Sequence, residues 1–358
     1  MIVGGGPAGA TAALLLARAG RPVTVIERTP APSHRICGEF LGGDALRLLA
    51  AIGVDVGRLG ASPIDRMRFI RGSRVVETAL PFPAAGVSRL ALDAALLDLS
   101  VAAGASVFRG RRARSVDETT GTVVVEGLGA LRPAATFLAT GKHELRGVGR
   151  RLGGAADPKV GLKTHLRLAP AQAAALRGSV ELMLFPDAYA GLQMVTAEVA
   201  NLCMVVAESR LARAGSWPGL LADLARACPP LERRLCESRG WEKPLAIART
   251  PYGFVHAAQP GDTPMFRLGD QMGVIPSFAG DGIAMALRTA TLAAGTLLAD
   301  GTARDYHARA RRSIRRPIRL ATMLYRAGHV AAGQASMMAA ARAWPGLLRG
   351  AAALTRAG

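Results

Sequence analysis

The sequence predicts an α/β protein in three parts: a βαβ core around a parallel sheet, an inserted, mostly antiparallel sheet, and a helical C-terminal segment. The chain opens with a short strand, a glycine-rich turn and a helix of small apolar residues, MIVGGGPAGATAALLLARAG. Its middle contains apolar runs of strand length, among them VELMLF and NLCMVVAE. Residues 302–358 combine eleven arginines with apolar residues at helical spacing.

The composition is that of a folded protein with a sizeable core, because half of the 358 residues are apolar. The formal net charge is +19, but nearly all of the positive charge is arginine and no nucleic-acid-binding motif accompanies it, so we expect no nucleic-acid partner. Four widely spaced cysteines fit neither a disulfide framework nor a zinc site, which predicts a reducing compartment and no metal. We recognise no signal peptide and no apolar window of 18 residues, and expect a cytoplasmic protein.

The opening turn has the spacing Gly4-x-Gly6-x-x-Gly9 directly after the strand Met1–Val3. The first glycine permits a tight turn, the second lets backbone N–H groups approach a pyrophosphate, and the third lets helix and strand pack closely. The N-terminus of the helix adds partial positive charge. Only three residues precede Gly4, so we expect either a short strand or a natural start that lies further upstream.

The helix after this turn has matching boundary residues. Pro7 suits the first helical turn because its missing N–H is not needed there, and Gly20 suits the position just past the helix end. A second strand over 23–26 then ends in Glu27, which is placed to accept hydrogen bonds from ribose hydroxyls. Strand, bounded helix and acid in this order form a specific, Rossmann-like signal for a bound dinucleotide.

A second glycine-containing stretch, FRLGDQMGVIPSFAGDGIAMAL, lies near residue 275. We expect a strand over 265–268 that leads into Gly269 and Asp270, and a long helix from Gly280-Asp281-Gly282 to about residue 299. Asp270 is placed to bond the ribityl hydroxyls of a flavin, and the helix N-terminus would face an electron-rich ring edge. A plain nicotinamide dehydrogenase has no use for such an element, so FAD is favoured over NAD.

The two motifs together, GxGxxG and G-D-x5-P-x3-G-x-G, resemble the FAD-dependent oxidoreductases of the para-hydroxybenzoate hydroxylase-like fold, the class A flavoprotein monooxygenases. That group contains aromatic hydroxylases, flavin halogenases and geranylgeranyl reductases. The resemblance covers about residues 1–300. It implies FAD as the cofactor and, because no second GxGxxG is present, NAD(P)H as a transient reductant.

Three further segments carry the resemblance. RICGEFLGGDALRLLAAIGV (35–54) looks most like the geranylgeranyl reductases, which have Arg-x-x-Cys-Gly before a helix. VSRLALDAALLDLSVAAGASV (87–107) and TFLATGKHELRG (136–147) match the group's next helix and the turn that returns to the cofactor. The residues that the resemblance assigns to FAD are Gly4, Gly6, Pro7, Ala8, Gly9, Glu27, Arg28, Arg35, Cys37, Gly38, Arg89, Thr140, Gly141, Gly269, Asp270, Pro276, Gly280 and Gly282.

Some elements of the group are changed or missing. Thr140-Gly141 stands where the aromatic hydroxylases have Asp-Gly, and the halogenase motif W-x-W-x-I-P is absent, so we do not expect halogenation. The Tyr-x-Trp-x-Phe-Pro segment of the reductases has only a partial counterpart in YAGLQMV, which begins at Tyr189.

The segments between the cofactor motifs predict a second domain. IDRMRFI and RVVETAL flank an Arg71-Gly72-Ser73 turn and indicate a hairpin, while VGLKTHLRL, VELMLF, AGLQMVTA and NLCMVVAE indicate four more strands. We therefore expect an FAD-binding domain of residues 1–61, 86–157 and 256–300, and a substrate domain of residues 62–85 and 158–255.

The substrate site is expected where the inserted sheet covers the flavin, because ligand pockets commonly lie between domains. An apolar pocket follows if six sheet residues face inward, and an ordinary core if they do not: Met183, Phe185, Tyr189, Leu192, Met194 and Met204. No acid–base pair is recognisable, in keeping with a flavin that carries the chemistry. The candidate substrate-site residues are Cys37, Gly38, Glu39 and Tyr189, with a small buried thiol as the alternative reading of Cys37.

The C-terminal segment, 301–358, is predicted to form two or three basic helices, with Pro317 expected to kink or break the first. One alternative is a cap packed on the flavin domain with a solvated arginine face. The other is an amphipathic surface peripheral to the inner face of an anionic membrane. Membrane contact would suit a lipophilic substrate.

The sequence leaves three functions open. The main expectation is an FAD-dependent monooxygenase: NAD(P)H reduces the flavin, O2 forms a flavin hydroperoxide, and an apolar aromatic or polyketide-like small molecule is hydroxylated. The second is a reductase that delivers hydride to a carbon–carbon double bond of a prenyl substrate, although the reductase segment after Tyr189 is incomplete. The third is a flavin-binding redox module without turnover, which the complete cofactor motifs disfavour.

Overall fold

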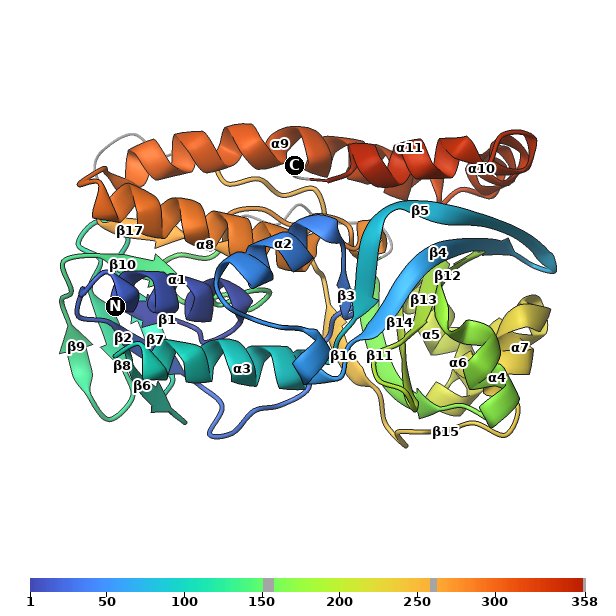
Figure 1. Cartoon of the computed structure of the whole chain (residues 1–358), viewed down its shortest axis with the longest axis horizontal. Coiled ribbons are helices and arrows are strands. Elements are labelled where there is room, and N and C mark those ends of the chain that lie inside the picture. Colours follow the sequence, from blue (N-terminus) through green and yellow to red (C-terminus); the bar gives the residue numbers. More distant parts are fainter. Residues whose placement is uncertain (151–157, 258–262, 357–358) are drawn as a thin grey trace.

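A parallel sheet and a larger, mostly antiparallel sheet lie side by side in the chain, and helices cover both (Figure 1). The computed structural model describes residues 1–150, 158–257 and 263–356. Within them the parallel sheet has the order β17 (Met265–Arg267), β10 (Thr136–Leu138), β1 (Ile2–Val3), β2 (Thr24–Glu27) and β6 (Ser106–Arg109). The predicted α/β class is confirmed. The expected domain boundaries stay a prediction, and 151–157, 258–262 and 357–358, which they include, lie outside the described residues.

Three helices pack together beside the parallel sheet: α1 (Pro7–Arg18), α3 (Arg89–Ala102) and α8 (Gly282–Leu298). Helix α1 is buried along almost its whole length, which its small side chains, PAGATAALLLAR, permit because neighbouring backbones can approach closely. The helices and strands predicted around the two glycine motifs agree with those observed to within one or two residues. A further helix, α2 (Gly43–Ala51), contacts α8.

The larger sheet contains both inserted segments. Its order is β15 (Arg239–Gly240), β11 (Lys159–Arg167), β14 (Val199–Ala207), β13 (Ala188–Met194), β12 (Gly178–Phe185), β4 (Ser62–Arg71), β5 (Arg74–Gly86) and β3 (Phe40–Leu41), and β16 (Leu245–Ala248) also pairs with β11. All these pairs are antiparallel except β12 with β4, the contact that joins the two insertions. The predicted hairpin and four strands are therefore confirmed.

The two faces of this sheet have different partners. One face packs against α4 (Pro170–Leu176), α6 (Trp217–Ala227) and α7 (Pro229–Leu235), and α5 (Glu208–Ala214) packs on α6 and β14. Five of the six residues considered for an apolar pocket lie in this core: Met183, Phe185, Leu192, Met194 and Met204. The pocket interpretation is wrong for these five, because side chains alternate along a strand and theirs point to the helices. Only Tyr189 of the six points to the opposite face.

A small three-stranded sheet, β7 (Ala113–Val116), β8 (Val123–Val125) and β9 (Gly129–Leu131), was not expected from the sequence. Its strands have three or four residues each and are joined by turns that contain glycine and threonine. Such short strands give almost no alternation to detect.

The C-terminal segment forms α9 (Ala303–Ala327), α10 (Ala331–Ala343) and α11 (Gly346–Leu354). Helix α9 continues through Pro317, so the expected break there is wrong. Buried Ile314 and Ile318 on either side of the proline pack onto Gly273, and this burial offsets the lost backbone hydrogen bond. Helix α9 packs on α8, whereas α10 and α11 lie over β4 and β5 (Figure 1). The cap therefore covers the larger sheet as well as the flavin domain.

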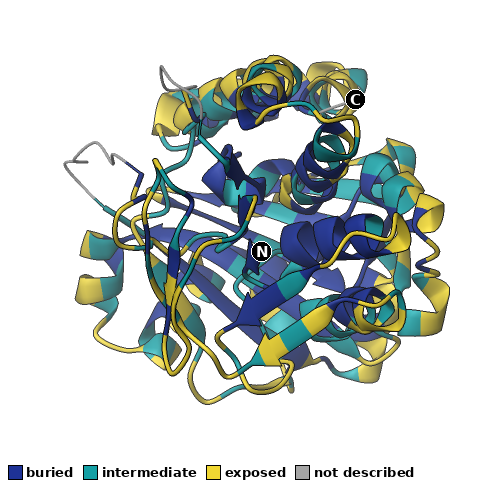
Figure 2. Cartoon of the chain, turned by 90° about the vertical axis from the view of Figure 1, so that its left-hand side faces the viewer, coloured by how far each residue is buried: buried dark blue, intermediate teal, exposed yellow. Residues whose placement is uncertain are grey.

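The outer side of the C-terminal helices is exposed. Figure 2, which views the end with the parallel sheet, shows buried residues at the centre and exposed ones along the uppermost helices. Among the described residues, no helix has both the length and the apolar character needed to cross a membrane.

Candidate cofactor and substrate site

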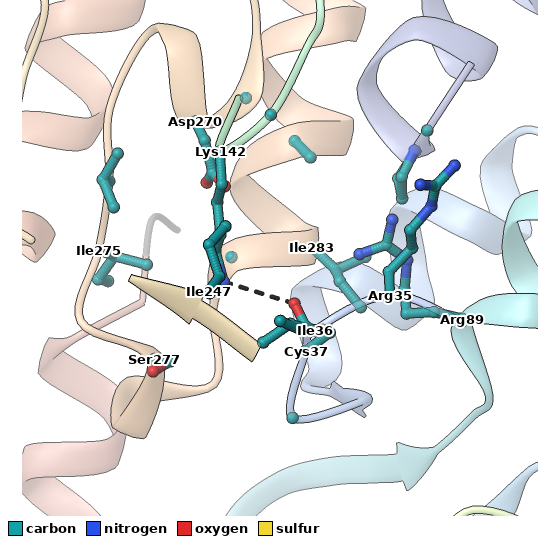
Figure 3. Close-up of a pocket in the computed structure, with 18 of the residues that line it drawn as sticks. Arg35, Ile36, Cys37, Arg89, Lys142, Ile247, Asp270, Ile275, Ser277 and Ile283 are labelled. Carbon is teal, nitrogen blue, oxygen red and sulfur yellow. Dashed lines mark hydrogen bonds between the residues drawn. The ribbon is translucent and has the colours of Figure 1, made fainter. Parts of the chain in front are cut away.

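A cavity of about 920 Å³ lies between the parallel sheet and the larger sheet. The loops after β1, β2 and β10, the start of α8, one face of the larger sheet and the C-terminal helices form its walls. Figure 3 shows part of it, with Arg35, Cys37 and Arg89 on one side and Asp270 and Ile275 on the other. Ligands of open α/β sheets bind at this position, outside the carboxyl ends of parallel strands.

The turn after β1 is so tight that two of its positions accept only glycine. Gly4 has φ +106°, and a Cβ there would lie 2.4 Å from the carbonyl oxygen of Ala139. A Cβ on Gly9 would lie 1.8 Å from the carbonyl oxygen of Gly4. Helix α1 then begins at Pro7 with no side-chain cap and no acidic residue in its first turn. Its first N–H groups have no partner within the helix and are available to an anion in the cavity.

Glu27 ends β2 and faces the same turn. Its carboxylate accepts hydrogen bonds from Gly5 N (2.8 Å) and from the backbone N and hydroxyl of Thr29 (2.9 and 2.6 Å), and Arg35 Nη2 donates from 3.2 Å. Burial raises the pKa of Glu27, but these hydrogen bonds and the charge of Arg35 outweigh it and hold the pKa below its ordinary value. Glu27 is therefore an ionised acceptor in the cavity wall.

Arginines surround this end of the cavity. Arg89 donates to Asp93 through Nε (2.6 Å) and Nη2 (2.7 Å); burial lowers the pKa of Arg89, but Asp93 raises it above its ordinary value. Arg28 Nη2 donates to Nε2 of His143 at 2.6 Å. Burial and the charge of Arg28 lower the pKa of His143, so its ring is a neutral acceptor.

The second glycine motif forms the opposite end of the cavity. Gly280 and Gly282 line it, and α8 begins there with no acid in its first turn. Asp281, at the N-cap, makes no side-chain cap; its Oδ1 accepts a hydrogen bond from Arg356 at 3.0 Å. The first N–H groups of α8 are therefore uncapped where they meet the cavity. Asp270 also lines it.

These features fit FAD. Two uncapped helix N-termini and two carboxylates border one cavity, so α1 and the arginines would hold the pyrophosphate, Glu27 the ribose, Asp270 the ribityl chain and α8 the flavin ring. Of the residues that the sequence assigns to FAD, Gly9 and Pro276 lie behind the wall, where they shape the turns, and the others line the cavity. Their contacts with FAD stay a prediction.

Comparisons with known proteins agree with this cofactor. Residues 1–130 match the model of the family described as FAD binding domain. A probable FAD-dependent monooxygenase from Pseudomonas aeruginosa, PqsL, has the same fold: it superposes with a TM-score of 0.74 at 17% identity over 94% of this chain and 97% of its own. Residues 1–130 are therefore an FAD-binding domain. The fold of the chain is that of the class A, monooxygenase-like group.

Two more proteins similar to this chain are informative. The halogenase PltM superposes with a TM-score of 0.76 at 14% identity over 92% of this chain and 76% of its own. Menaquinone reductase from Mycobacterium tuberculosis is 35% identical over 136 residues, which are 35% of this chain and 32% of the reductase. The match thus spans about a third of that curated relative.

Next to the larger sheet, the loop with Cys37, Gly38 and Glu39 lines the cavity. Asn201 Nδ2 donates to the carbonyl oxygens of Gly38 (2.7 Å) and Cys37 (3.1 Å), and Gln193 Nε2 also donates to that of Gly38 (2.8 Å). Polar side chains of the larger sheet thus hold this loop in place.

Glu39 lies at the end of this loop in a left-handed conformation (φ +58°) and is fully buried. Its carboxylate contacts Lys163 Nζ at 2.5 Å and accepts hydrogen bonds from His165 Nε2 (2.6 Å) and Arg89 N (2.7 Å). Burial raises the pKa of Glu39, but His165 and Lys163 outweigh it and hold the pKa below its ordinary value. The carboxylate is occupied by protein groups, which makes Glu39 a positioning residue in this arrangement.

Lys142 is a cavity residue that the sequence reasoning missed. It follows the Thr140-Gly141 turn, and in Figure 3 its side chain reaches towards Ile36, whose carbonyl oxygen accepts from Nζ at 3.4 Å. Burial lowers the pKa of Lys142, but Tyr252 and Asp270 outweigh it and raise the pKa above its ordinary value. A charged ammonium therefore stands in the cavity wall.

A line of three hydroxyls lies in the same wall. Ser277 Oγ is hydrogen-bonded to the hydroxyls of both Tyr189 and Tyr252, the latter at 2.7 Å. Burial raises the pKa of both tyrosines, so both are neutral. Tyr189 was expected here from the sequence, whereas Tyr252 lies in a segment without a motif and Ser277 occupies a variable position of the second glycine motif.

The C-terminal helices also reach the site, which the sequence did not indicate. Arg356 donates to Asp281 and to the carbonyl oxygen of Gly280 (3.4 Å), and its guanidinium lies over the rings of Phe82 (4.4 Å) and Phe40 (5.6 Å). Its side chain is only 10% exposed. This contact fixes the end of α11 to the N-terminus of α8.

Proposed function

We propose that the protein is a monooxygenase that uses FAD, NAD(P)H and O2 to hydroxylate an apolar aromatic or polyketide-like small molecule. The observation that supports this best is the polar line of Lys142, Tyr252, Ser277 and Tyr189 in a largely apolar wall. A ring that carries an oxygen substituent would meet hydrogen-bond donors at one edge and apolar side chains elsewhere.

One hydroxyl proton of this line is not used in the hydrogen bonds within it. Tyr189, Ser277 and Tyr252 have three hydroxyl protons and share two hydrogen bonds, so one proton can be donated to a substrate oxygen. Lys142 Nζ uses one of its three protons on Ile36. The two groups would therefore bind a phenolic or enolic oxygen and stabilise it when it ionises.

The proposed hydroxylation needs only FAD, O2 and NAD(P)H besides the substrate. Bound FAD supplies two-electron reduction and the activation of O2. One oxygen atom enters a C–H bond of the ring, the other leaves as water, and NAD(P)H supplies the two electrons. The chain's own residues would orient the ring and exclude water from it.

A second candidate is a reductase of carbon–carbon double bonds in a prenyl substrate. The similarity of 136 residues to menaquinone reductase from M. tuberculosis favours it, as does the cavity position of the Arg35-Ile36-Cys37-Gly38 segment. A polar line for an oxygen substituent has no evident use in the reduction of an isolated double bond, and we therefore place this function second.

One assay separates the two. Consumption of NAD(P)H by the purified FAD-loaded protein is followed with and without O2, using a panel of phenols, enolic polyketide analogues and prenyl compounds. Hydroxylation needs O2 and gives a product about 16 mass units heavier. Consumption without O2 and a gain of two hydrogens in the product would refute the monooxygenase and support the reductase.

The polar line can be tested separately by comparing Lys142→Met with Lys243→Met, which removes an exposed lysine. We expect Lys142→Met to weaken binding of a phenol by about tenfold or more, as the loss of a charged hydrogen bond implies, and Lys243→Met to leave it unchanged. A neutral ring without oxygen should bind both variants equally. Equal phenol affinity in both would contradict the assigned role.

We also propose that the C-terminal helices contact an anionic membrane from the cytoplasmic side. Large apolar side chains are exposed there beside arginines: Met323, Val330, Trp344, Leu347 and Leu354. Basic charge with exposed apolar residues suits an anionic surface. Sedimentation with phosphatidylcholine vesicles, with and without phosphatidylglycerol, tests this: binding should need the anionic lipid and fall in Trp344→Ala but not in Val75→Ala, an exposed residue of another element. Equal sedimentation of wild type with both vesicle types would refute it.

A further inference from the structure

The cavity has an arm that the cofactor does not account for. It lies between the face of the larger sheet opposite α6 and the C-terminal helices. Its walls come from β4, β5 and β12 on one side and α10 and α11 on the other: Met67, Phe69, Leu80, Leu182, Met337 and Leu348. None of these side chains carries a charge or a strong hydrogen-bonding group.

The rest of the arm is equally apolar. Ala351 and Ala352 of α11 line it, and the hydroxyl of Thr355 is already used, since it donates to Ala351 O at 3.1 Å. Arg356, at the end of the same segment, is paired with Asp281. The Nε of Arg356 is buried without a hydrogen-bond partner, but it lies at the end of the arm, beside the start of α8. The described walls between the sheet and α10–α11 are apolar, so the arm suits a hydrocarbon.

The arm meets the hydroxyl line at one point. Tyr189 belongs to the same apolar cluster as Phe69, Met337 and Leu348, and its hydroxyl is bonded to Ser277. A ligand that fills both regions therefore has an oxygen-bearing head and an apolar extension.

We infer that the arm binds a hydrocarbon chain carried by the substrate, which is then an amphiphile with an oxygenated ring near Tyr252 and a chain between the sheet and α10–α11. The ring's position rests on the proposed function. The chain site does not, because it depends only on the apolar walls. An alkyl and an isoprenoid chain share the chemistry that the arm recognises.

The test is a binding titration of the FAD-loaded protein with 4-ethyl-, 4-butyl-, 4-hexyl- and 4-octylphenol, read from the change in the flavin spectrum without NAD(P)H. Each buried methylene should lower Kd about fourfold, the equivalent of ~0.8 kcal/mol. We expect the affinity for 4-octylphenol to be at least about a hundredfold higher than that for 4-ethylphenol. A Kd that does not depend on chain length would overturn the proposal.

A side chain that fills the arm should abolish the dependence of Kd on chain length. Ala352→Trp places a large side chain in the arm, whereas Ala353→Trp, the matched control, places it on the exposed side of α11. In Ala352→Trp the octylphenol should lose its advantage while ethylphenol binds as in wild type. If Ala352→Trp loses FAD, Leu80→Trp fills the arm from the sheet side instead. Retained chain-length dependence in an FAD-loaded filled-arm variant would refute the site.

Two further measurements identify the type of hydrocarbon chain and test the reaction. 4-Geranylphenol is compared with 4-octylphenol, and the tighter ligand identifies an isoprenoid or an alkyl chain. The same phenols then enter the oxygen-dependent assay. Chain-length-dependent binding without hydroxylation would overturn the proposed function and leave the arm in place, whereas hydroxylation of ethyl- and octylphenol with equal KM would overturn the arm.

Discussion

The buried pair of Lys163 and Glu39 offers the sharpest test of how the sheet supports the cofactor loop. Both side chains are 0% exposed and their charged atoms lie 2.5 Å apart. Lys163→Met leaves a buried carboxylate with its hydrogen bonds from His165 and Arg89 but without its counter-ion. Loss of one partner from a buried pair costs about 3–5 kcal/mol, so we expect the free energy of unfolding to fall by that amount.

Urea denaturation of the FAD-free protein, followed by far-UV circular dichroism, measures this loss. Arg167→Met is a matched control on the same strand, because Arg167 pairs with Glu198 at the surface, where both side chains are about two-thirds exposed. It should cost less than about 1 kcal/mol. The double variant Lys163→Met with Glu39→Gln removes the unpaired charge and should recover most of the loss. Equal, small losses in Lys163→Met and Arg167→Met would refute the reasoning.

Two further predictions concern the cofactor turn and acid stability. Gly9→Ala places a Cβ against the carbonyl oxygen of Gly4 and should abolish FAD retention after gel filtration, whereas Gly295→Ala, with no atom within 4 Å of its Cβ, should retain FAD. Burial lowers the pKa of His256 to about 3 and of His307 to about 4, from 6.5. The unfolded chain therefore binds more protons below pH 6.5, and stability should be fully present above it and fall as the pH drops towards 4, by up to about 1.4 kcal/mol per pH unit for each histidine. Urea titrations at pH 8, 6 and 5 measure this, and a stability unchanged down to pH 5 would contradict it.

The parts of the site that could be predicted are those that depend on local geometry. Gly4, Gly6, Gly9 and Glu27, at the end of the next strand, all belong to one strand–turn–helix–strand unit within residues 1–27. A single sequence contains all of that information. The start of α8 is predictable for the same reason, because Gly280 and Gly282 bracket a helix N-terminus.

The substrate face of the sheet could not be predicted. Alternation along a strand shows that neighbouring residues point to opposite faces, but both faces of this sheet are covered, one by helices and one by the cavity. Without a polar face to orient the strand, Leu192 and Met194 look no different from cavity residues. The residues that line the cavity are Gly191, which precedes Leu192, and Gln193, which lies between Leu192 and Met194.

The contributions of Lys142 and Arg356 depend on contacts between distant segments. Arg356 contacts Phe40 and Asp281 because α9 to α11 fold back over the molecule, and no local sequence pattern predicts such a contact. The continuous helix through Pro317 has the same origin, since tertiary burial of its neighbours overrides the local preference for a break.

The attachment of Arg356 to the N-terminus of α8 has a consequence for how this protein can diversify. The residues that would hold the cofactor and those that would shape the ligand space lie in different segments: the first are in the turns at residues 4–9 and 280–282, and the second include α10 and α11. Substitutions in that wall can change which molecules fit while the flavin keeps its place. Recombining residues 331–356 between homologous chains, with Arg356 retained as the anchor, is therefore a practical way to change which ligands the protein binds.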